Sequence, residues 1–266
     1  MQNLKEDLTI VFCTCDKYSY LWNGFFKLLI KYWPSCDLNI VLNTEKKHLN
    51  YGELKISDPT NCDPSNPWSK RFKIALNKVE TDYVLIMLDD FWLRSSVRVD
   101  VLNKCVALMK EDYNIKSFLF AWVPGLNKKS YKYAIFEQVR KFTPFRVNMQ
   151  IGVWRKDYIM NLLTDSETPW QFEVNASVRS IFKAGKVLSF KKNELPVFDY
   201  DFGALVVSGG YKKEIMEYFI KSENVVVDLE RIPVYVPKPK ESNASIKRGA
   251  RIIGYYVNAI LSLFKK

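Results

Sequence analysis

Thr81–Leu93 reads TDYVLIMLDDFWL, and the rest of the predicted sheet is arranged around this stretch. Tyr83–Leu88 is an unbroken apolar run, about the length of a strand buried on both faces of a parallel sheet. It stops at two adjacent carboxylates, Asp89 and Asp90, which are costly to bury as anions unless a cation, a hydrogen-bond donor or water compensates them. Because ligands of open α/β sheets bind at the carboxyl ends of strands, we interpret Asp89-Asp90 as the floor of a site. A solvated turn with helix-capping acids is the alternative.

The composition is that of a folded protein with a basic surface. The 266 residues are 48% hydrophobic and 15% aromatic, which is enough for one large α/β domain or two small ones. Lys and Arg number 40 against 29 Asp and Glu, a net charge of +11. This charge favours a polyanion, a phosphorylated small molecule or an anionic membrane as partner, and it does not choose among them.

The cysteines and the N-terminus predict a cytoplasmic protein. Five cysteines are scattered along the chain, and Cys13-x-Cys15 lacks the spacing of a zinc knuckle, so free thiols in a reducing compartment are expected. The first ten residues, MQNLKEDLTI, carry acids and lack a basic region followed by a long apolar core. No secretory signal is therefore expected.

Strands and helices alternate along the first third of the chain. The apolar run Leu8–Cys13 predicts a strand, and Tyr18–Tyr32 has the apolar spacing of a helix. Leu38–Leu42 predicts a second strand, and the polar, proline-containing Lys46–Pro67 predicts a loop. If the strands are parallel neighbours, the polar residues at their ends lie close together.

Several of these polar residues are candidates for binding a nucleotide. Asp16 and Asn43, at the ends of the two strands, are expected to contact a base or ribose, although such residues are also common turn formers. The next helix begins near a serine that we expect to cap it, followed by Lys70 and Arg71. Two cations at a helix start oppose the helix dipole unless an anion docks there; a solvated pair is the alternative.

The order strand–TCD, strand–N, then SKRxxxALxxxxxDYVLIMLDD resembles the nucleotide-sugar half of GT-A fold glycosyltransferases. The similarity is to the family 2 group, including bacterial polysaccharide and lipopolysaccharide enzymes, and spans roughly Leu8–Gly185. It implies a mostly parallel central sheet flanked by helices and a nucleotide-sugar donor. The resemblance implies that the residues at the family's donor-binding positions bind the donor here: Thr14, Asp16, Asn43, Lys70, Arg71 and Asp89.

The resemblance also implies a divalent cation, Mn²⁺ or Mg²⁺, held by Asp89 and Asp90 on the donor diphosphate. Phe91 occupies the third position of the family's D-x-D signature and cannot ligate a metal. Either Asp90 takes the ligand role, or the enzyme works without metal and Lys70 and Arg71 neutralise the leaving diphosphate.

A second stretch, Thr168–Glu173 (TPWQFE), resembles the acceptor half of family 2 enzymes. There an E-D pair precedes an arginine by six residues, and Glu173 precedes Arg179 by the same spacing. The resemblance makes Glu173 the general base of an inverting transferase, although Phe172 replaces its acidic partner. An ordinary helix-start acid is the alternative. Acceptor contacts are expected from Trp154, Trp170 and Arg179.

The remaining patterns complete an α/β alternation. Helices are predicted over Ser95–Met109 and Tyr158–Leu163, and strands over Lys116–Val123, Met149–Trp154 and Lys186–Phe190. The polar and aromatic residues 127–145 predict an acceptor-side loop, and the turn at residues 198–203 is expected to close the site.

Three segments and two rival functions follow from the sequence. We predict a GT-A-like domain over 1–232, a linker over 233–245 and an amphipathic tail over 246–266. The tail's basic and apolar residues suit the inner face of an anionic membrane, and a helix docked on the domain is the alternative.

The expected acceptor is a glycan or lipid-linked glycan, with no nucleic acid partner. A basic nucleic-acid-binding module and a nucleotidyltransferase are the alternative functions, and the latter lacks a glycine-rich loop after the first strand.

Overall fold

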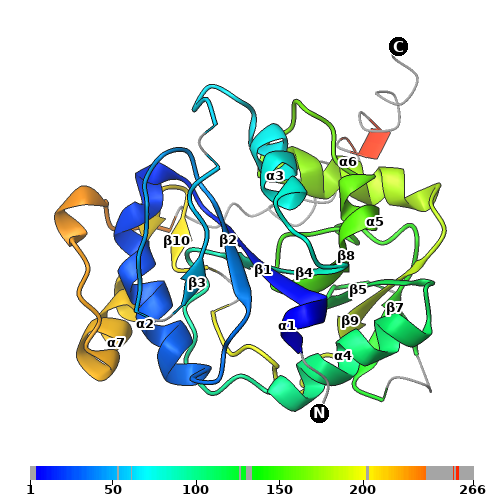
Figure 1. Cartoon of the computed structure of the whole chain (residues 1–266), viewed down its shortest axis with the longest axis horizontal. Helices are drawn as coiled ribbons and strands as arrows, with labels where there is room; N and C mark the ends of the chain where they lie inside the picture. The colour runs from blue at the N-terminus through cyan, green and yellow to red at the C-terminus, as the bar shows by residue number, and fades with distance from the viewer. Residues whose placement is uncertain are drawn as a thin grey trace.

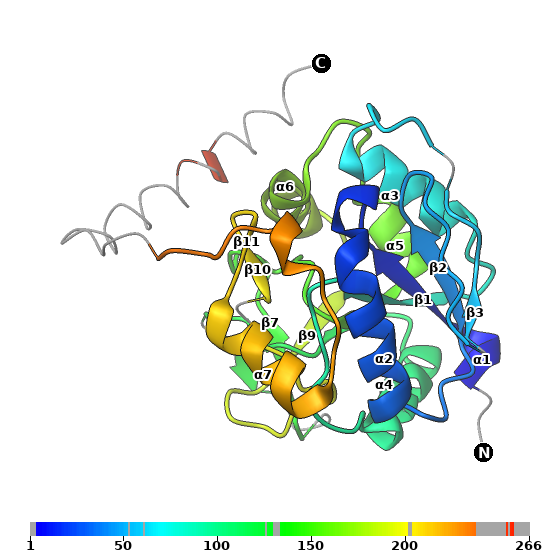
Figure 2. The ribbon, with the colours of Figure 1, turned by 90° about the vertical axis from the view of Figure 1, so that its left-hand side faces the viewer.

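The structure is a computed structural model that describes residues 4–52, 54–60, 62–125, 127–129, 134–201, 204–237, 254, 256 and 257. Helices cover both faces of one large sheet (Figure 1). On one face lie α2, α4 and α7, which stand together in Figure 2, and on the other lie α3, α5 and α6. The predicted α/β class, with a mostly parallel central sheet flanked by helices, is confirmed.

The described residues form a nine-stranded sheet of order β3-β2-β1-β4-β8-β5-β9-β7-β6. Its strands are β1 Leu8–Cys13, β2 Asn39–Asn43, β3 Lys55–Ile56, β4 Tyr83–Leu88, β5 Ile115–Leu119, β6 Lys128–Lys129, β7 Phe136–Val139, β8 Gly152–Arg155 and β9 Lys186–Phe190. β1 pairs in parallel with both β2 and β4, β2 with β3, and β5 with β9. β8 and β7 run against their neighbours.

The helices follow the apolar spacing of the sequence. They are α1 Leu4–Asp7, α2 Trp22–Tyr32, α3 Trp68–Asn77, α4 Val99–Glu111, α5 Lys156–Met160, α6 Pro169–Ile181 and α7 Lys213–Glu223, with 3₁₀ turns η1 Asp16–Leu21 and η2 Leu229–Arg231. Alternate residues of the strands separate into two cores because successive side chains point to opposite faces. Ile10 and Phe12 of β1 pack toward α2 and α4, whereas Val11 packs toward α3.

β4 is the fourth of the nine strands in sheet order and is an unbroken apolar run. Tyr83 to Met87 are buried, as expected for a strand covered on both faces. Its register with β1 runs from Leu8 opposite Tyr83 to Cys13 opposite Leu88. The residues that follow the two strands, Thr14 and Asp89, therefore emerge side by side.

The antiparallel strand β8 separates β4 from β5 and orients Trp154. This side chain is fully buried in the core under α3, α5 and α6, and its ring stacks on Tyr158 at 6.4 Å between centroids. No part of Trp154 is left for a substrate to contact. Its predicted role in acceptor binding is therefore wrong, because β8 is covered by a core on both faces.

The sequence predicted some elements better than others. The strands Leu8–Cys13, Tyr83–Leu88 and Lys186–Phe190 have the predicted bounds. The predicted loop over 127–145 contains β6 and β7, and a small antiparallel pair, β10 Val206–Val207 and β11 Gly210–Tyr211, lies in a region without a strand prediction.

The C-terminal segments can be described only in part. Most of the predicted tail, and the linker from residue 238 onward, lie outside the described residues. None of the helices in the described ranges combines the length and apolar character that a bilayer crossing requires.

Candidate functional site

The candidate site lies along the edge of the sheet where the parallel strands end. The carboxyl ends of β1, β2, β4, β5 and β9 share this edge, and the amino end of β8 joins them because β8 runs the other way. The helices α3 and α6 each precede a parallel strand, so their amino ends point to the same edge. Asp16, Asn43, Lys70, Asp89 and Glu173 are thus brought to one side of the molecule.

Asp89 connects the ends of β1 and β4. Thr14 Oγ1 donates a hydrogen bond to Asp89 Oδ2, and Trp22 Nε1 donates to Thr14 Oγ1 at 2.7 Å. Asp89 is buried, and this burial, with the adjacent Asp90 carboxylate, raises the pKa of Asp89 well above its ordinary value. One oxygen of Asp89 is thus engaged in holding the two central strands together.

Asp90 lies beside Asp89, and one of its carboxylate oxygens lacks a hydrogen-bond partner among the described residues. This oxygen, Oδ1, is buried. Burial raises the pKa of Asp90 to about 6, although backbone hydrogen bonds, including one from Val206, and the charge of Lys212 act in the opposite direction. Asp90 is therefore the carboxylate with capacity for a further ligand.

The residues present fit a divalent cation that shares its coordination with a bound ligand. The buried, unpartnered Oδ1 of Asp90 is a hard oxygen donor of the kind that Mg²⁺ and Mn²⁺ prefer. Phe91 is buried and packs on Tyr200 at 4.6 Å between ring centroids, so the third D-x-D position supplies nothing. No cluster of three or more His, Cys, Asp or Glu side chains occurs within the described part of the chain. Oxygens of a phosphate or of water would have to complete the shell.

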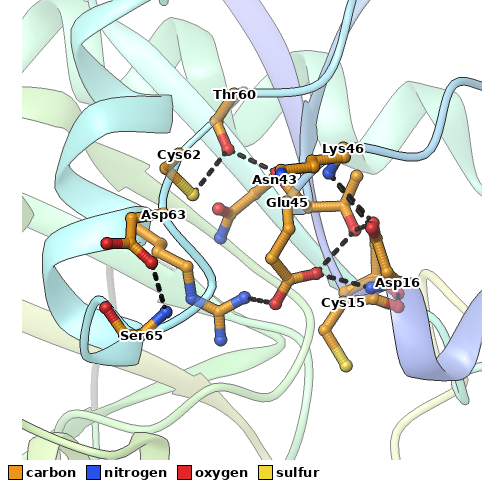
Figure 3. A network of polar contacts seen from close by, with 12 residues as sticks. Cys15, Asp16, Asn43, Glu45, Lys46, Thr60, Cys62, Asp63 and Ser65 are labelled. Carbon is orange, nitrogen blue, oxygen red and sulfur yellow. Dashed lines mark hydrogen bonds and ion pairs between the residues drawn. The ribbon is translucent and has the colours of Figure 1, made fainter.

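Asp16 and Glu45 belong to a partly buried polar network that links the loops after β1 and β2 (Figure 3). The Asp16 carboxylate accepts hydrogen bonds from Thr44 Oγ1 at 2.8 Å and from the backbone amides of residues 46 and 47 at 3.0–3.2 Å. Partial burial opposes these bonds, but together they lower the pKa of Asp16. Glu45 accepts from the Asp16 amide at 2.6 Å and pairs with the Arg71 guanidinium.

This network changes the expected roles of its members. The charge of Arg71 is balanced by Glu45 inside the protein, and Asp16 accepts bonds that shape its own loop. Asn43 is also buried: its side chain contacts Cys13 Sγ at 3.8 Å, and its carbonyl accepts from the Thr14 amide at 3.1 Å. These residues form the structural floor beneath the strand ends.

The start of α3 differs from its prediction. The N-cap is Pro67, and Ser69, which we expected to cap the helix, is buried in the first turn. Ser69 exchanges hydrogen bonds with Glu167, from Ser69 N–H to Glu167 O at 3.1 Å and from Glu167 N–H to Ser69 Oγ at 2.8 Å. The serine therefore joins the amino ends of α3 and α6. Lys70 is exposed, and its charge contributes, after the Ser65 hydrogen bonds, to lowering the pKa of Asp63.

Two pockets open on the same edge of the sheet, on either side of the acid pair in strand order. The first, of about 360 Å³, is lined by Asp16, Lys17, Tyr18, Ser19, Tyr20, Lys47, Gly209, Ile232 and Pro233. The second, of about 590 Å³, is lined by residues that follow β5, residues that follow β9, and Phe145, Asn148, Gln150 and Glu173. Because β4 lies between β1 and β5, Asp89 and Asp90 follow a strand between the two pockets.

Glu173 is a half-buried carboxylate in the wall of the larger pocket. It lies in the first turns of α6, which Thr168 and Gln171 begin with a reciprocal capping box. Its Oε1 accepts from the Met149 amide at 2.8 Å. Burial raises the pKa of Glu173, and the Met149 bond offsets part of this effect. The side chain thus has the environment expected of a general base.

The other two predicted acceptor residues lie elsewhere. Arg179 forms a two-pronged ion pair with Glu167, at 2.8 and 2.7 Å, and donates to Leu162 O at 2.8 Å. It therefore fastens the segment before α6 to the helix. Trp170 is 75% exposed and lines neither pocket.

Sequence reasoning missed Gln150, which joins the acid pair to the larger pocket. Tyr200 O–H donates to Gln150 Oε1 at 2.8 Å, and the Tyr200 ring packs on Phe91, the residue after Asp90. Gln150 in turn lines the pocket that contains Glu173. The signal was present in the sequence as polar residues before the strand at 152–155, but only the antiparallel direction of β8 turns them toward the site.

Comparison with known proteins identifies structural neighbours only. No protein-family model and no curated protein matches the sequence. A fragment of Staphylococcus aureus TarS, residues 1–349, superposes with a TM-score of 0.48 and 12% identity over 96% of this chain and 72% of that one. A longer TarS structure is covered over 43% of its length.

Two further neighbours have been solved with nucleotides bound. Glucosyl-3-phosphoglycerate synthase from Mycobacterium tuberculosis, in complex with Mn²⁺ and UDP-glucose, gives a TM-score of 0.43 and 6% identity over 71% of this chain and 73% of that one. CMP-2-keto-3-deoxy-manno-octonic acid synthetase, in complex with CTP, gives a TM-score of 0.44 and 12% identity over 82% of this chain and 100% of that one. The neighbours are thus GT-A-type glycosyltransferases and related nucleotidyltransferases.

The Glu45–Arg71 pair provides a test of the structural floor. The side chains are only 10% and 14% exposed. Arg71→Met should therefore leave Glu45 buried without a counter-charge and lower the free energy of unfolding by about 3–5 kcal/mol. The double variant Arg71→Met/Glu45→Gln should recover most of this loss in urea unfolding. A single variant as stable as the wild type would show that Arg71 has no structural partner.

Proposed function

We propose that this protein is a glycosyltransferase that transfers a sugar from a nucleotide-sugar donor to a glycan or lipid-linked glycan. One observation supports this above all: an incompletely satisfied carboxylate pair ends a strand that lies between two pockets. Such an arrangement suits a reaction with two substrates whose bond exchange takes place at the strand end.

The donor nucleotide is assigned to the smaller pocket and the acid pair. Tyr18 and Tyr20 line this pocket and offer aromatic surface to a base, and the diphosphate would extend toward Asp90. Because Glu45 balances Arg71, the exposed Lys70 at the start of α3 is the better candidate of the two cations for a phosphate contact. Asp89 acts mainly through Thr14, by fixing the position of its neighbour.

Asp90, with Asp89 beside it, would hold the divalent cation. When bound, the cation would neutralise charge on the leaving diphosphate. The protein's own contribution is a dry, rigid setting, because Trp22 and Thr14 fix Asp89 through hydrogen bonds.

Glu173 is proposed as the base that deprotonates the acceptor hydroxyl. An acceptor in the larger pocket would have its hydroxyl near the Glu173 carboxylate, while the sugar donor approaches from the side of Asp90. The hydroxyl oxygen forms the new bond to the anomeric carbon, the proton passes to Glu173, and the bond to the diphosphate breaks. A single displacement of this kind inverts the anomeric configuration.

The larger pocket has the chemistry of a carbohydrate site. Trp122 offers partly exposed aromatic surface, with Lys192 Nζ 5.2 Å from its ring centroid. Asn148 and Gln150 supply amides, and Glu173 a carboxylate. Aromatic stacking combined with a few polar groups is how concave sites orient a neutral polar ligand.

The alternatives account for less of the structure. A nucleic-acid-binding module gives no role to the buried Asp89 and the partly buried Asp90 beside a pocket that Glu173 lines. A nucleotidyltransferase has support among the structural neighbours, but the segment after β1 is the 3₁₀ turn η1 rather than a glycine-rich loop. A separate base for an acceptor hydroxyl favours glycosyl transfer.

The Asp90 assignment can be tested by donor binding. Asp90→Asn should remove the thermal stabilisation produced by UDP-glucose or UDP-GlcNAc with Mn²⁺ and lower any turnover by about 10²–10³-fold. The variant should remain folded, because the pKa of Asp90 is raised by burial and neutralising it removes a cost of folding at neutral pH. Asp157→Asn, at the opposite edge of the sheet, is the control. Donor response equal to the wild type would remove Asp90 from the site.

The Glu173 assignment predicts both a rate and a pH profile. Glu173→Gln should keep donor affinity and lose about 10²–10⁴-fold in turnover. In the wild type, turnover should fall as the pH drops through the raised pKa of Glu173, since protonation removes the base. Glu111→Gln, at the far edge of the sheet, should change neither. A retained anomeric configuration would contradict the role given to Glu173.

We also propose that the tail, residues 246–266, binds the inner face of an anionic membrane, which would bring a lipid-linked acceptor within reach. The support is the sequence alone, where Lys247, Arg248 and Arg251 precede an apolar run. Replacing these three residues with Gln should weaken sedimentation with anionic vesicles by about 10²-fold at low salt, at ~1 kcal/mol per charge. Zwitterionic vesicles are the control, and unchanged binding to anionic vesicles would refute the proposal.

A further inference from the structure

A strained turn forms part of the wall of the larger pocket. Thr143 O accepts from the Arg146 amide at 3.2 Å, which closes a four-residue turn over Thr143, Pro144, Phe145 and Arg146. Phe145 has a φ of 55°, in the left-handed region that a bulky side chain rarely adopts. Proline at the second position and a positive φ at the third are the features of a type II turn, where glycine is usual. Surrounding contacts must therefore hold Phe145 in place.

Tyr256 supplies those contacts from a distant part of the sequence. Its hydroxyl accepts from the Phe145 amide at 3.1 Å and donates to the Thr143 carbonyl at 3.5 Å. One hydroxyl thus bonds to two backbone groups of the same turn. In a type II turn the amide of the third residue makes no bond within the turn, so Tyr256 satisfies a donor that the turn itself leaves unpaired.

The Tyr256 ring also packs on the helix that carries the proposed base. Tyr256 and Phe145 both lie against Val174 and Val178, which are buried on the outer face of α6. Glu173 immediately precedes Val174. The turn, the aromatic ring and the helix therefore form one packed unit.

Hydrogen bonds continue from the turn to the pocket. Phe145 itself lines the pocket, and its carbonyl accepts from Asn148 Nδ2 at 2.9 Å. Asn148 Oδ1 accepts from the Gln150 amide at 3.1 Å, and Glu173 Oε1 accepts from the Met149 amide at 2.8 Å. The Asn148 side chain and the Gln150 backbone are thus positioned through this short segment, and Glu173 bonds to its Met149 amide.

We infer that Tyr256 is a positioning residue for the larger pocket. It does not line the pocket; it holds the Thr143–Arg146 turn, and through it the orientation of Asn148, Gln150 and Glu173. That this pocket receives the acceptor rests on the proposed function. Tyr256 thus packs on the domain, whereas Lys247, Arg248 and Arg251 are the residues of the same segment that we propose for membrane binding.

Tyr256→Phe isolates the hydroxyl because the ring and its packing on α6 are kept. Amide hydrogen exchange should show protection of Phe145 lowered by about fivefold to tenfold, the effect of one net hydrogen bond, with a smaller loss at Met149 and Gln150. Tyr113→Phe is the matched control: it loses a hydroxyl bond to Asp157 of 2.8 Å at the opposite edge of the sheet and should leave these amides unchanged. Val257→Ala, beside Tyr256 in sequence and half exposed, should also have no effect.

Turnover provides the second readout. With UDP-GlcNAc as donor probe and p-nitrophenyl glycosides as acceptor probes, Tyr256→Phe should raise the acceptor KM by a similar factor and leave the donor KM unchanged. Unchanged exchange at Phe145 would overturn the inference, whatever the activity. An equal rise in both KM values would overturn the pocket-specific role. Altered exchange in a protein whose wild type turns over no nucleotide sugar would refute the proposed function and leave the role of Tyr256 in the turn intact.

Discussion

Burial of Asp89 and partial burial of the adjacent Asp90, at the end of β4, is the constraint on which the other features of this protein depend. Asp89 and Asp90 follow β4 into a segment whose next residues, Phe91 to Leu93, are all buried. The chain thus leads from the acids into the core, and burial raises the pKa of both. Asp89 is partly compensated by Thr14 across the β1–β4 pair, and Asp90 keeps one oxygen without a partner. A site is the physical consequence of this incomplete compensation.

Most of the polar residues around this pair stabilise the strand ends themselves. Glu45 accepts from the Asp16 amide and pairs with Arg71, and Glu167, which precedes α6, pairs with Arg179 of that helix. A residue whose charge is already balanced within the protein contributes less to ligand binding, because its partner must first be displaced or shared. The distinction between supporting and binding residues therefore follows from counting the bonds each side chain already makes.

The sequence predicted the sheet well and the chemistry of individual side chains less well. β1, β4 and β9 are continuous apolar runs bounded by polar residues, so their bounds could be predicted. The edge on which the site lies also followed, because parallel strands end together. The resemblance made Glu173 a general base from its spacing to Arg179. The structure places Glu173 in the lining of the larger pocket, and Arg179 is a structural partner of Glu167.

The predictions that the structure did not match depended on contacts between segments that are distant in the sequence. Nothing near Arg71 in the sequence indicates that Glu45 balances its charge, and no local pattern shows that Trp154 faces the core. The short strands β6, β7, β10 and β11 lack a long apolar run and form only because a partner strand is present. Gln150 could not be assigned because a strand's direction is a property of the sheet and not of its own residues.

The direction of β8 also has a consequence for how the sheet is completed. β1, β2 and β4 can pair as soon as residues 8–88 have been made, but the second neighbour of β4 is β8, at Gly152–Arg155. During synthesis β4 therefore has an open edge until residues 89–151 have been added and β8 has been made. An open apolar edge is a place where other chains can pair. The acids that close β4, and the short segment Phe91-Trp92-Leu93 that folds back after them, keep this exposed edge only six residues long.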